Sequence, residues 1–91
     1  MNQADFEAQL RRDGFDEIVT AELKPNETRD THAHDYEVCA LVLEGGITLT
    51  CDGEARAYKA GEIFTMAAGR PHIEQVGATG IRYLAGRRHK V

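Results

Sequence analysis

Residues 36–51 read YEVCALVLEGGITLTC and form the most strand-like stretch of the chain. Two apolar runs flank Glu44-Gly45-Gly46, a segment whose glycines are typical of a tight turn. We expect a hairpin with Glu44-Gly45 as its turn and Val42 opposite Ile47. One face of this hairpin then carries an apolar set that we expect to form the core. Its members are Val38, Ala40, Val42, Ile47, Leu49 and Cys51.

The opposite face of this hairpin is also partly apolar, because it carries Cys39, Leu41 and Leu43. A strand that is apolar on both faces is usually covered on both. Either an N-terminal helix or a second subunit could provide the second cover. Apolar area left in water costs about 25 cal/mol per Å² relative to burial, so we predict a homodimer. The cysteines Cys39 and Cys51 fall on opposite faces and should not pair.

Turn signals recur on both sides of the hairpin. Pro25-Asn26, Asp52-Gly53 and residues 59–61 have turn compositions, and residues 77–80 are expected to join the last two strands. The polar residues 27–30 are interpreted as a loop. Short strands separated by frequent turns predict an all-β protein. We therefore expect an antiparallel β-barrel or jelly roll of six to eight strands.

The N-terminal residues have a different pattern. Residues 4–12 are good helix formers, Phe6 and Leu10 lie four apart on one helical face, and Gly14 is a typical helix stop. We predict a short helix within residues 1–14, followed by a single barrel domain over residues 15–91.

Composition limits the classes of function. The chain has 91 residues, 42% hydrophobic and 29% charged, which is typical of a globular domain. Its net charge of -4 argues against nucleic-acid binding. It has no apolar run of the roughly 18 residues that a membrane helix needs, and residues 1–10 do not resemble a secretory signal. We expect a cytoplasmic protein with free thiols and no membrane partner.

The histidines carry the chemistry. His32 and His34 are two residues apart, so in an extended chain their imidazoles point the same way and could bind one metal ion. His72 follows Gly61 and Gly69 at regular spacing. The spacing of these histidines and glycines resembles that of two sequence motifs of the cupin superfamily. The first is His-x-His, three or four residues, Glu, six residues and Gly, and the second is Gly, five residues, Pro-x-Gly, two residues, His, three residues and Asn.

The chain therefore resembles a small single-domain cupin over roughly residues 23–84. The resemblance implies a barrel in which His32, His34 and His72 bind one divalent ion, which could be zinc, iron, nickel, manganese or copper. Two positions depart from the second motif: Ala67 stands for its proline and Val76 for its terminal asparagine.

The carboxylate of the first motif departs as well. It should fall at position 38 or 39, whereas Glu37 is one residue early. Strand alternation turns Glu37 outward unless a β-bulge near Asp35 re-aims it. We keep Glu37 as a candidate fourth metal ligand. Glu74, two residues after His72, should share the face of that histidine and is the alternative carboxylate.

The inner face also supplies a candidate pocket beside the histidines. Besides Glu74, the pocket residues with polar or reactive side chains are Tyr36 and Cys51. An open-sided ion there suits an enzyme acting on a small oxygenated molecule, of the dioxygenase, isomerase or lyase type. The alternatives are a ligand-binding or sensor protein without catalysis, and a structural dimer with a vestigial site. The sequence leaves the choice between them open.

Overall fold

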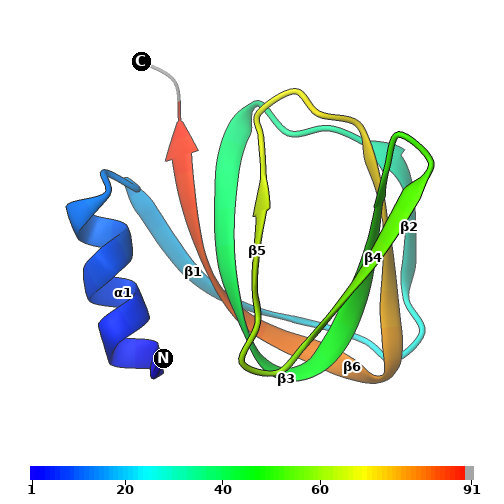
Figure 1. The fold of residues 1–91 in the computed structure, drawn as a ribbon, viewed down its shortest axis with the longest axis horizontal. Coiled ribbons are helices and arrows are strands. Elements are labelled where there is room, and N and C mark those ends of the chain that lie inside the picture. The colour runs from blue at the N-terminus through cyan, green and yellow to red at the C-terminus, as the bar shows by residue number, and fades with distance from the viewer. Residues whose placement is uncertain (90–91) are drawn as a thin grey trace.

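A computed structural model describes residues 1–89 (Figure 1). The last two residues of the predicted barrel domain, 90 and 91, lie outside the described residues. The described residues form one helix and six strands: α1 (Gln3–Arg12), β1 (Glu17–Leu23), β2 (Thr28–His32), β3 (Tyr36–Cys51), β4 (Glu54–Lys59), β5 (Ile63–Met66) and β6 (His72–His89). The strand pairs are all antiparallel, which confirms the predicted jelly roll with a short N-terminal helix. The sheet is folded over rather than closed on itself.

The two long strands β3 and β6 run through both halves of the jelly roll. Residues 36–45 of β3 pair with residues 81–89 of β6, and β1 and β5 flank this pair. Residues 47–50 of β3 pair with residues 73–76 of β6, and β2 and β4 flank that pair. The two halves face each other across the core (Figure 1).

The hairpin predicted at Glu44-Gly45 is wrong. β3 continues through this segment, and its partner on both sides is β6. The register shifts between Val42 and Glu44 and again between Gly45 and Ile47, where Gly45 has a φ of 74°. These irregularities interrupt the alternation of side chains, so Val42 and Ile47 still share one face. The turn predicted at residues 77–80 is likewise part of β6.

The loop predicted at residues 27–30 is also wrong, because Thr28–His32 form β2. Nearly all of this strand is exposed, so it has no apolar alternation that could identify it in the sequence. Its pairing with β6 identifies it as a strand. The turns predicted at Pro25-Asn26 and Asp52-Gly53 are present, with positive φ at Asn26 and Asp52.

The predicted core face is confirmed. Ala40, Val42, Ile47 and Leu49 are buried in the cluster between the two halves, and Val38 and Cys51 pack against it. Cys39 belongs to a second cluster on the other face of the sheet, so the two cysteines do lie on opposite faces.

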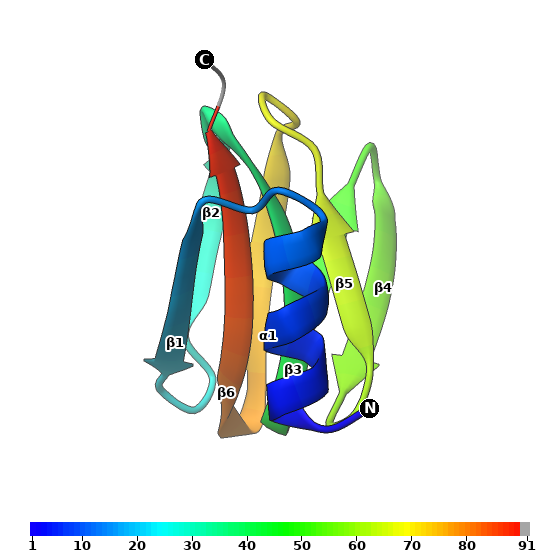
Figure 2. The ribbon, with the colours of Figure 1, turned by 90° about the vertical axis from the view of Figure 1, so that its left-hand side faces the viewer.

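Helix α1 covers that second face (Figure 2). The Asn2 side chain caps the helix by accepting a hydrogen bond from the Asp5 backbone N–H at 2.8 Å. Phe6 and Leu10 then bury their side chains against Leu41 of β3, and Leu43 packs beside them. The apolar face from which the homodimer was predicted is therefore occupied by the chain itself and gives the dimer no support.

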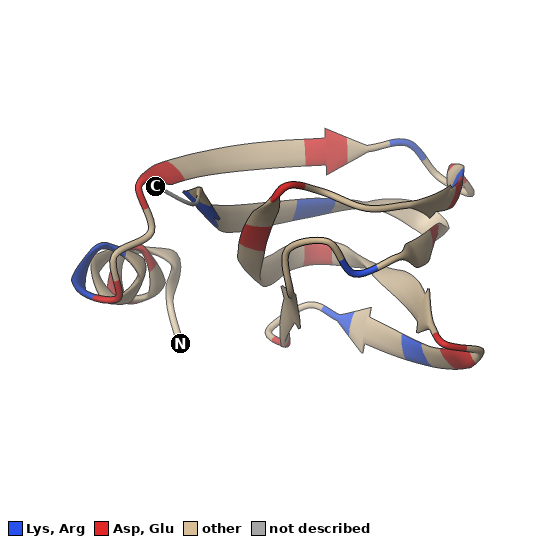
Figure 3. Cartoon of the chain, turned by 90° about the horizontal axis from the view of Figure 1, so that it is seen from above, with Lys and Arg blue, Asp and Glu red and all other residues tan. Residues whose placement is uncertain are grey.

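Charged residues of both signs occur on the helix and on the strands (Figure 3). Within residues 1–89, no helix is long and apolar enough to cross a membrane.

Candidate metal centre

His32 and His72 face each other across the β2–β6 pair. His32 is the last residue of β2, His72 is the first of β6, and they are register partners. The Nδ1 atom of His32 lies 2.8 Å from the Asp30 carbonyl oxygen, and Nδ1 of His72 lies 2.9 Å from that of Arg70. A carbonyl oxygen only accepts, so each Nδ1 carries the proton that it donates. In the neutral imidazole each Nε2 then carries the lone pair, which points away from the backbone.

His34 lies in the connection between β2 and β3. Its backbone carbonyl accepts a hydrogen bond from the Gly69 N–H at 2.7 Å, which ties this connection to the loop before β6. Its ring stacks on Tyr36 with 4.8 Å between centroids. The His34 ring centroid is 5.0 Å from that of His32 and 5.3 Å from that of His72. The three imidazoles therefore converge, as the sequence predicted.

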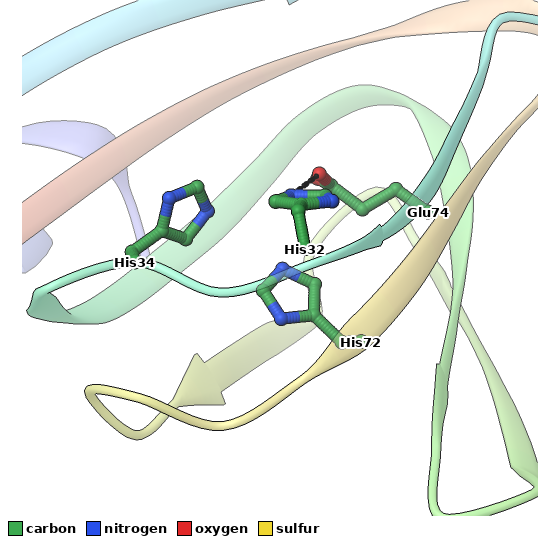
Figure 4. Close-up of side chains that lie close together, drawn as sticks. All are labelled: His32, His34, His72 and Glu74. Carbon is green, nitrogen blue, oxygen red and sulfur yellow. Dashed lines mark ion pairs between the residues drawn. The ribbon is translucent and has the colours of Figure 1, made fainter.

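Glu74 completes the cluster from β6 (Figure 4). Its Oε2 atom lies 2.8 Å from Nε2 of His32. One ligand atom from each of His32, His34, His72 and Glu74 can be chosen so that all four lie within 4.8 Å of one another. Burial lowers the pKa of His34, and the neighbouring His32 and His72 lower it further, which favours the neutral imidazole that a metal ion needs.

The donor set fits a cation. Nε2 of His32 and Oε2 of Glu74 are both buried, and neither has a hydrogen-bond partner although the two atoms are in contact. Imidazoles and carboxylates bind a divalent ion when the lone pairs of a nitrogen and an oxygen atom face the same point, as they can here.

Glu37, the other candidate ligand, lies outside this cluster. It is half-exposed on the outer face of β3, and its carboxylate is 3.5 Å from the Arg88 guanidinium. The register irregularity that the sequence allowed near Asp35 occurs earlier, between Arg29 and His32 of β2. This irregularity does not turn the Glu37 side chain inward, and the carboxylate that lies with the histidines is that of Glu74.

A cavity of about 80 Å³ adjoins the cluster. Its apolar lining consists of Val38, Leu49, Phe64, Met66 and Ala85. Its polar lining consists of Arg29, His34, Tyr36, His72, Glu74, Tyr83 and Arg87. Of the predicted pocket residues, Tyr36 and Glu74 line this cavity and Cys51 does not. Cys51 lines a separate surface hollow, where its Sγ lies 3.9 Å from Sδ of Met66.

Comparison with known proteins identifies the family. A family model described as a cupin domain matches residues 19–79. The chain is a cupin.

Three solved structures show the same fold at low sequence identity. A protein of unknown function from Rhizobium leguminosarum superposes with a TM-score of 0.75 at 22% identity, covering 80% of this chain and 69% of that one. A Schizosaccharomyces pombe cupin domain superposes with a TM-score of 0.71 at 13% identity, covering 80% of this chain and 55% of that one. A variant of Bacillus subtilis oxalate decarboxylase superposes with a TM-score of 0.63 at 25% identity, covering 79% of this chain and 20% of that one. The cupin thus spans between a fifth and about two thirds of these chains. No curated protein sequence matches it.

Sequence reasoning missed three polar residues of this cupin's cavity: Arg29, Tyr83 and Arg87. Tyr83 and Arg87 follow an available signal, because they lie two and six residues after Ile81, which is in the core, and therefore share its face. Arg29 gives no such signal. It lies three residues before His32, and only the register irregularity between them places both side chains on the same side of β2.

Proposed function

We propose that this cupin binds one divalent metal ion through His32, His34, His72 and Glu74. The contact between His32 and Glu74 carries the proposal. A neutral imidazole that donates through Nδ1 has only a lone pair on Nε2, and an ionised carboxylate oxygen has only lone pairs. Two such atoms at 2.8 Å repel each other unless a positive charge lies between them.

The positive charge is either a proton or a metal ion. A shared proton would make this contact an ion pair, whereas a metal ion would bind both atoms, and the convergence of two further imidazoles on them favours the metal ion. Leaving a buried polar atom unpaired costs about 1–3 kcal/mol, which a metal ion bound to both atoms removes. A bound ion would be held by His32 through Nε2 and by Glu74 through Oε2.

The chain's own residues hold the ligands in place. The carbonyl groups of Asp30 and Arg70 fix the tautomers and orientations of two imidazoles, and the Tyr36 ring supports the third. When bound, the ion supplies a Lewis acid that can bind or polarise an oxygen atom of a small molecule. Mixed imidazole and carboxylate ligands suit zinc, iron, nickel, manganese and copper.

The adjoining cavity favours a small-molecule ligand for this cupin. We propose that such a molecule binds beside the metal, either as the substrate of a metal-dependent enzyme or as the ligand of a non-catalytic sensor. The fold relative from Bacillus subtilis is by its name an enzyme acting on oxalate, which supports the first alternative. The cavity itself supports both equally, because binding is their common step.

Metal titration of stripped protein tests the proposal. Zinc or iron(II) is added to the wild type, to His34→Ala and to His89→Ala, and binding is followed by calorimetry and elemental analysis. His89 is a matched control, since it lies on β6 outside the cluster and pairs with Asp16 at 3.0 Å. We expect one ion per chain in the wild type and His89→Ala, and an affinity at least tenfold lower in His34→Ala. Equal affinity in all three would overturn the proposal.

A further inference from the structure

Two arginines line the cavity next to the histidine cluster. Arg29 is the register partner of Glu74, and the irregularity in β2 turns it to the same side as His32. Arg87 follows Tyr83 and Ala85 at every second position of β6, and all three line the cavity. The strand geometry thus directs two guanidinium groups from different strands to one small space.

Each guanidinium keeps donors free for a ligand. Nε of Arg29 lies 3.1 Å from the Glu27 carboxylate, and Nη1 of Arg87 lies 3.5 Å from that of Glu17. An arginine has five N–H donors, so one carboxylate neighbour leaves several unused. Neither Glu27 nor Glu17 lines the cavity, where Glu74 is the one acidic residue among the described lining residues.

The tyrosines add neutral polar groups to the same space. The Arg87 guanidinium lies over the Tyr36 ring, 5.0 Å from its centroid, which restrains the direction in which the arginine points. Burial raises the pKa of Tyr83, and the Glu74 carboxylate raises it further, so its hydroxyl remains a hydrogen-bond donor at neutral pH.

We propose that the cavity binds a small organic carboxylate, held by Arg29 and Arg87 next to the metal site. This inference rests on the proposed function, because it gives the chemical class of the molecule that binds beside the metal. The planar fork of an arginine matches the two oxygens of a carboxylate. Within the cavity lining the two arginines outnumber the one carboxylate, Glu74, and a bound metal ion would add further positive charge.

The size and lining of the cavity restrict the ligand further. A volume of about 80 Å³ is far below the roughly 300–1,000 Å³ of pockets for drug-sized ligands. The apolar residues Phe64, Met66 and Ala85 would contact a short hydrocarbon portion. Inorganic phosphate has no such portion, so the cavity favours an organic acid of a few carbon atoms.

Calorimetric titration with lactate tests this inference. Propane-1,2-diol is the matched ligand, since it replaces the carboxylate by a neutral hydroxymethyl group, and inorganic phosphate is the alternative anion. Zinc-loaded wild type is compared with Arg29→Gln, Arg87→Gln and Arg82→Gln. Arg82 pairs with Glu44 at 2.7 Å outside the cavity, so its substitution removes the same charge elsewhere.

We expect lactate to bind wild type and Arg82→Gln at least tenfold more tightly than propane-1,2-diol. The affinity for lactate should fall at least tenfold in Arg29→Gln and Arg87→Gln, with zinc still bound. Equal lactate affinity in all four proteins, no lactate binding, or tighter binding of phosphate would overturn the inference while leaving the metal site intact. If the wild type takes up no metal, the proposed function fails. Lactate binding to the metal-free variants then decides the anion site separately.

Discussion

A Cβ atom added to Gly45 of β3 would lie 1.9 Å from the carbonyl oxygen of Gly80 in β6. The two strands approach this closely where both bend from one half of the jelly roll into the other. Gly45 also has a φ of 74°, a conformation that side chains with a Cβ rarely adopt. We expect Gly45→Ala to lower the free energy of unfolding by about 2 kcal/mol or more, measured by urea denaturation.

Gly53→Ala is the control for this substitution. Gly53 has a similar φ of 79°, but nothing lies within 4 Å of the position of an added Cβ. Its substitution should cost only the conformational strain, about 1–2 kcal/mol. Equal losses in the two variants would show that the close approach of β3 and β6 is unimportant.

Leu10 is the clearest test of the helix packing. Its side chain is 1% exposed and lies among Phe6, Phe15, Leu41 and Leu84. Leu10→Ala should lower the free energy of unfolding by about 2–5 kcal/mol, because it leaves a cavity under α1. The exposed Arg12→Ala on the same helix should change it by no more than about 0.5 kcal/mol. Similar stabilities for the two variants would contradict the packing of α1 on the sheet.

The homodimer stays a prediction that sedimentation over a range of micromolar concentrations can test. Its original motive was the apolar face of Leu41 and Leu43, which packs with α1. A dimer observed in solution would therefore have to use another surface, and Leu10→Ala should not alter its association directly.

Tyr83 predicts a dependence of stability on alkaline pH. Its phenol has a pKa raised above the ordinary 10.0, first by burial and then by the Glu74 carboxylate. The unfolded chain therefore releases this proton at a lower pH than the folded chain. The contribution of Tyr83 is full below about pH 10 and is lost as the pH rises through the folded-state pKa.

Urea denaturation between about pH 8 and pH 11 measures this contribution. Tyr36 and Tyr58 are present in both the wild type and Tyr83→Phe, so the difference between the two proteins isolates Tyr83. Wild type should lose more stability than Tyr83→Phe above about pH 10. Parallel profiles would show that the phenol is not buried as described.

The segment 36–51 shows how far the sequence could predict the fold. Its apolar residues predicted the core face correctly, because the side chains that a strand buries are the apolar ones of the sequence pattern. The pattern around Gly45 indicated a hairpin because glycine favours a positive φ in a turn and in a bulge alike. Only the pairing of both halves of β3 with β6, far along the chain, distinguishes the two.

The site was predictable to a similar extent. The spacing of His32, His34 and His72 predicted their convergence, and strand alternation placed Glu74 beside His72. Arg29 escaped prediction because its direction depends on an irregularity in a polar, exposed strand. Regular alternation thus located the histidines and Glu74 and was available for Tyr83 and Arg87, which were overlooked, but it could not place Arg29.

The choice of carboxylate gives the most direct prediction about the metal. Glu74→Gln keeps the shape of the side chain and removes its charge next to His32. We expect it to lower zinc affinity at least tenfold. Glu37→Gln should change the affinity less than twofold, because Glu37 lies on the outer face beside Arg88. Equal losses in both variants, or no loss in Glu74→Gln, would show that Glu74 is not a ligand.

The stabilisation of the folded chain by zinc should depend on pH, and thermal unfolding with and without zinc measures this dependence. A ligand that binds only the folded chain stabilises it by about 2.7 kcal/mol at 100 times its Kd, or roughly 10–20 °C in Tm for a domain of this size. Metal binding needs neutral imidazoles, so this shift should decline as the pH falls below about 6.5. The depressed pKa of His34 keeps that ligand available to lower pH than an ordinary histidine. The shift should therefore be large in wild type near pH 7.5, small near pH 5, and reduced at both values in Glu74→Gln. A shift that is equal at the two pH values would mean that zinc binds to groups other than these histidines.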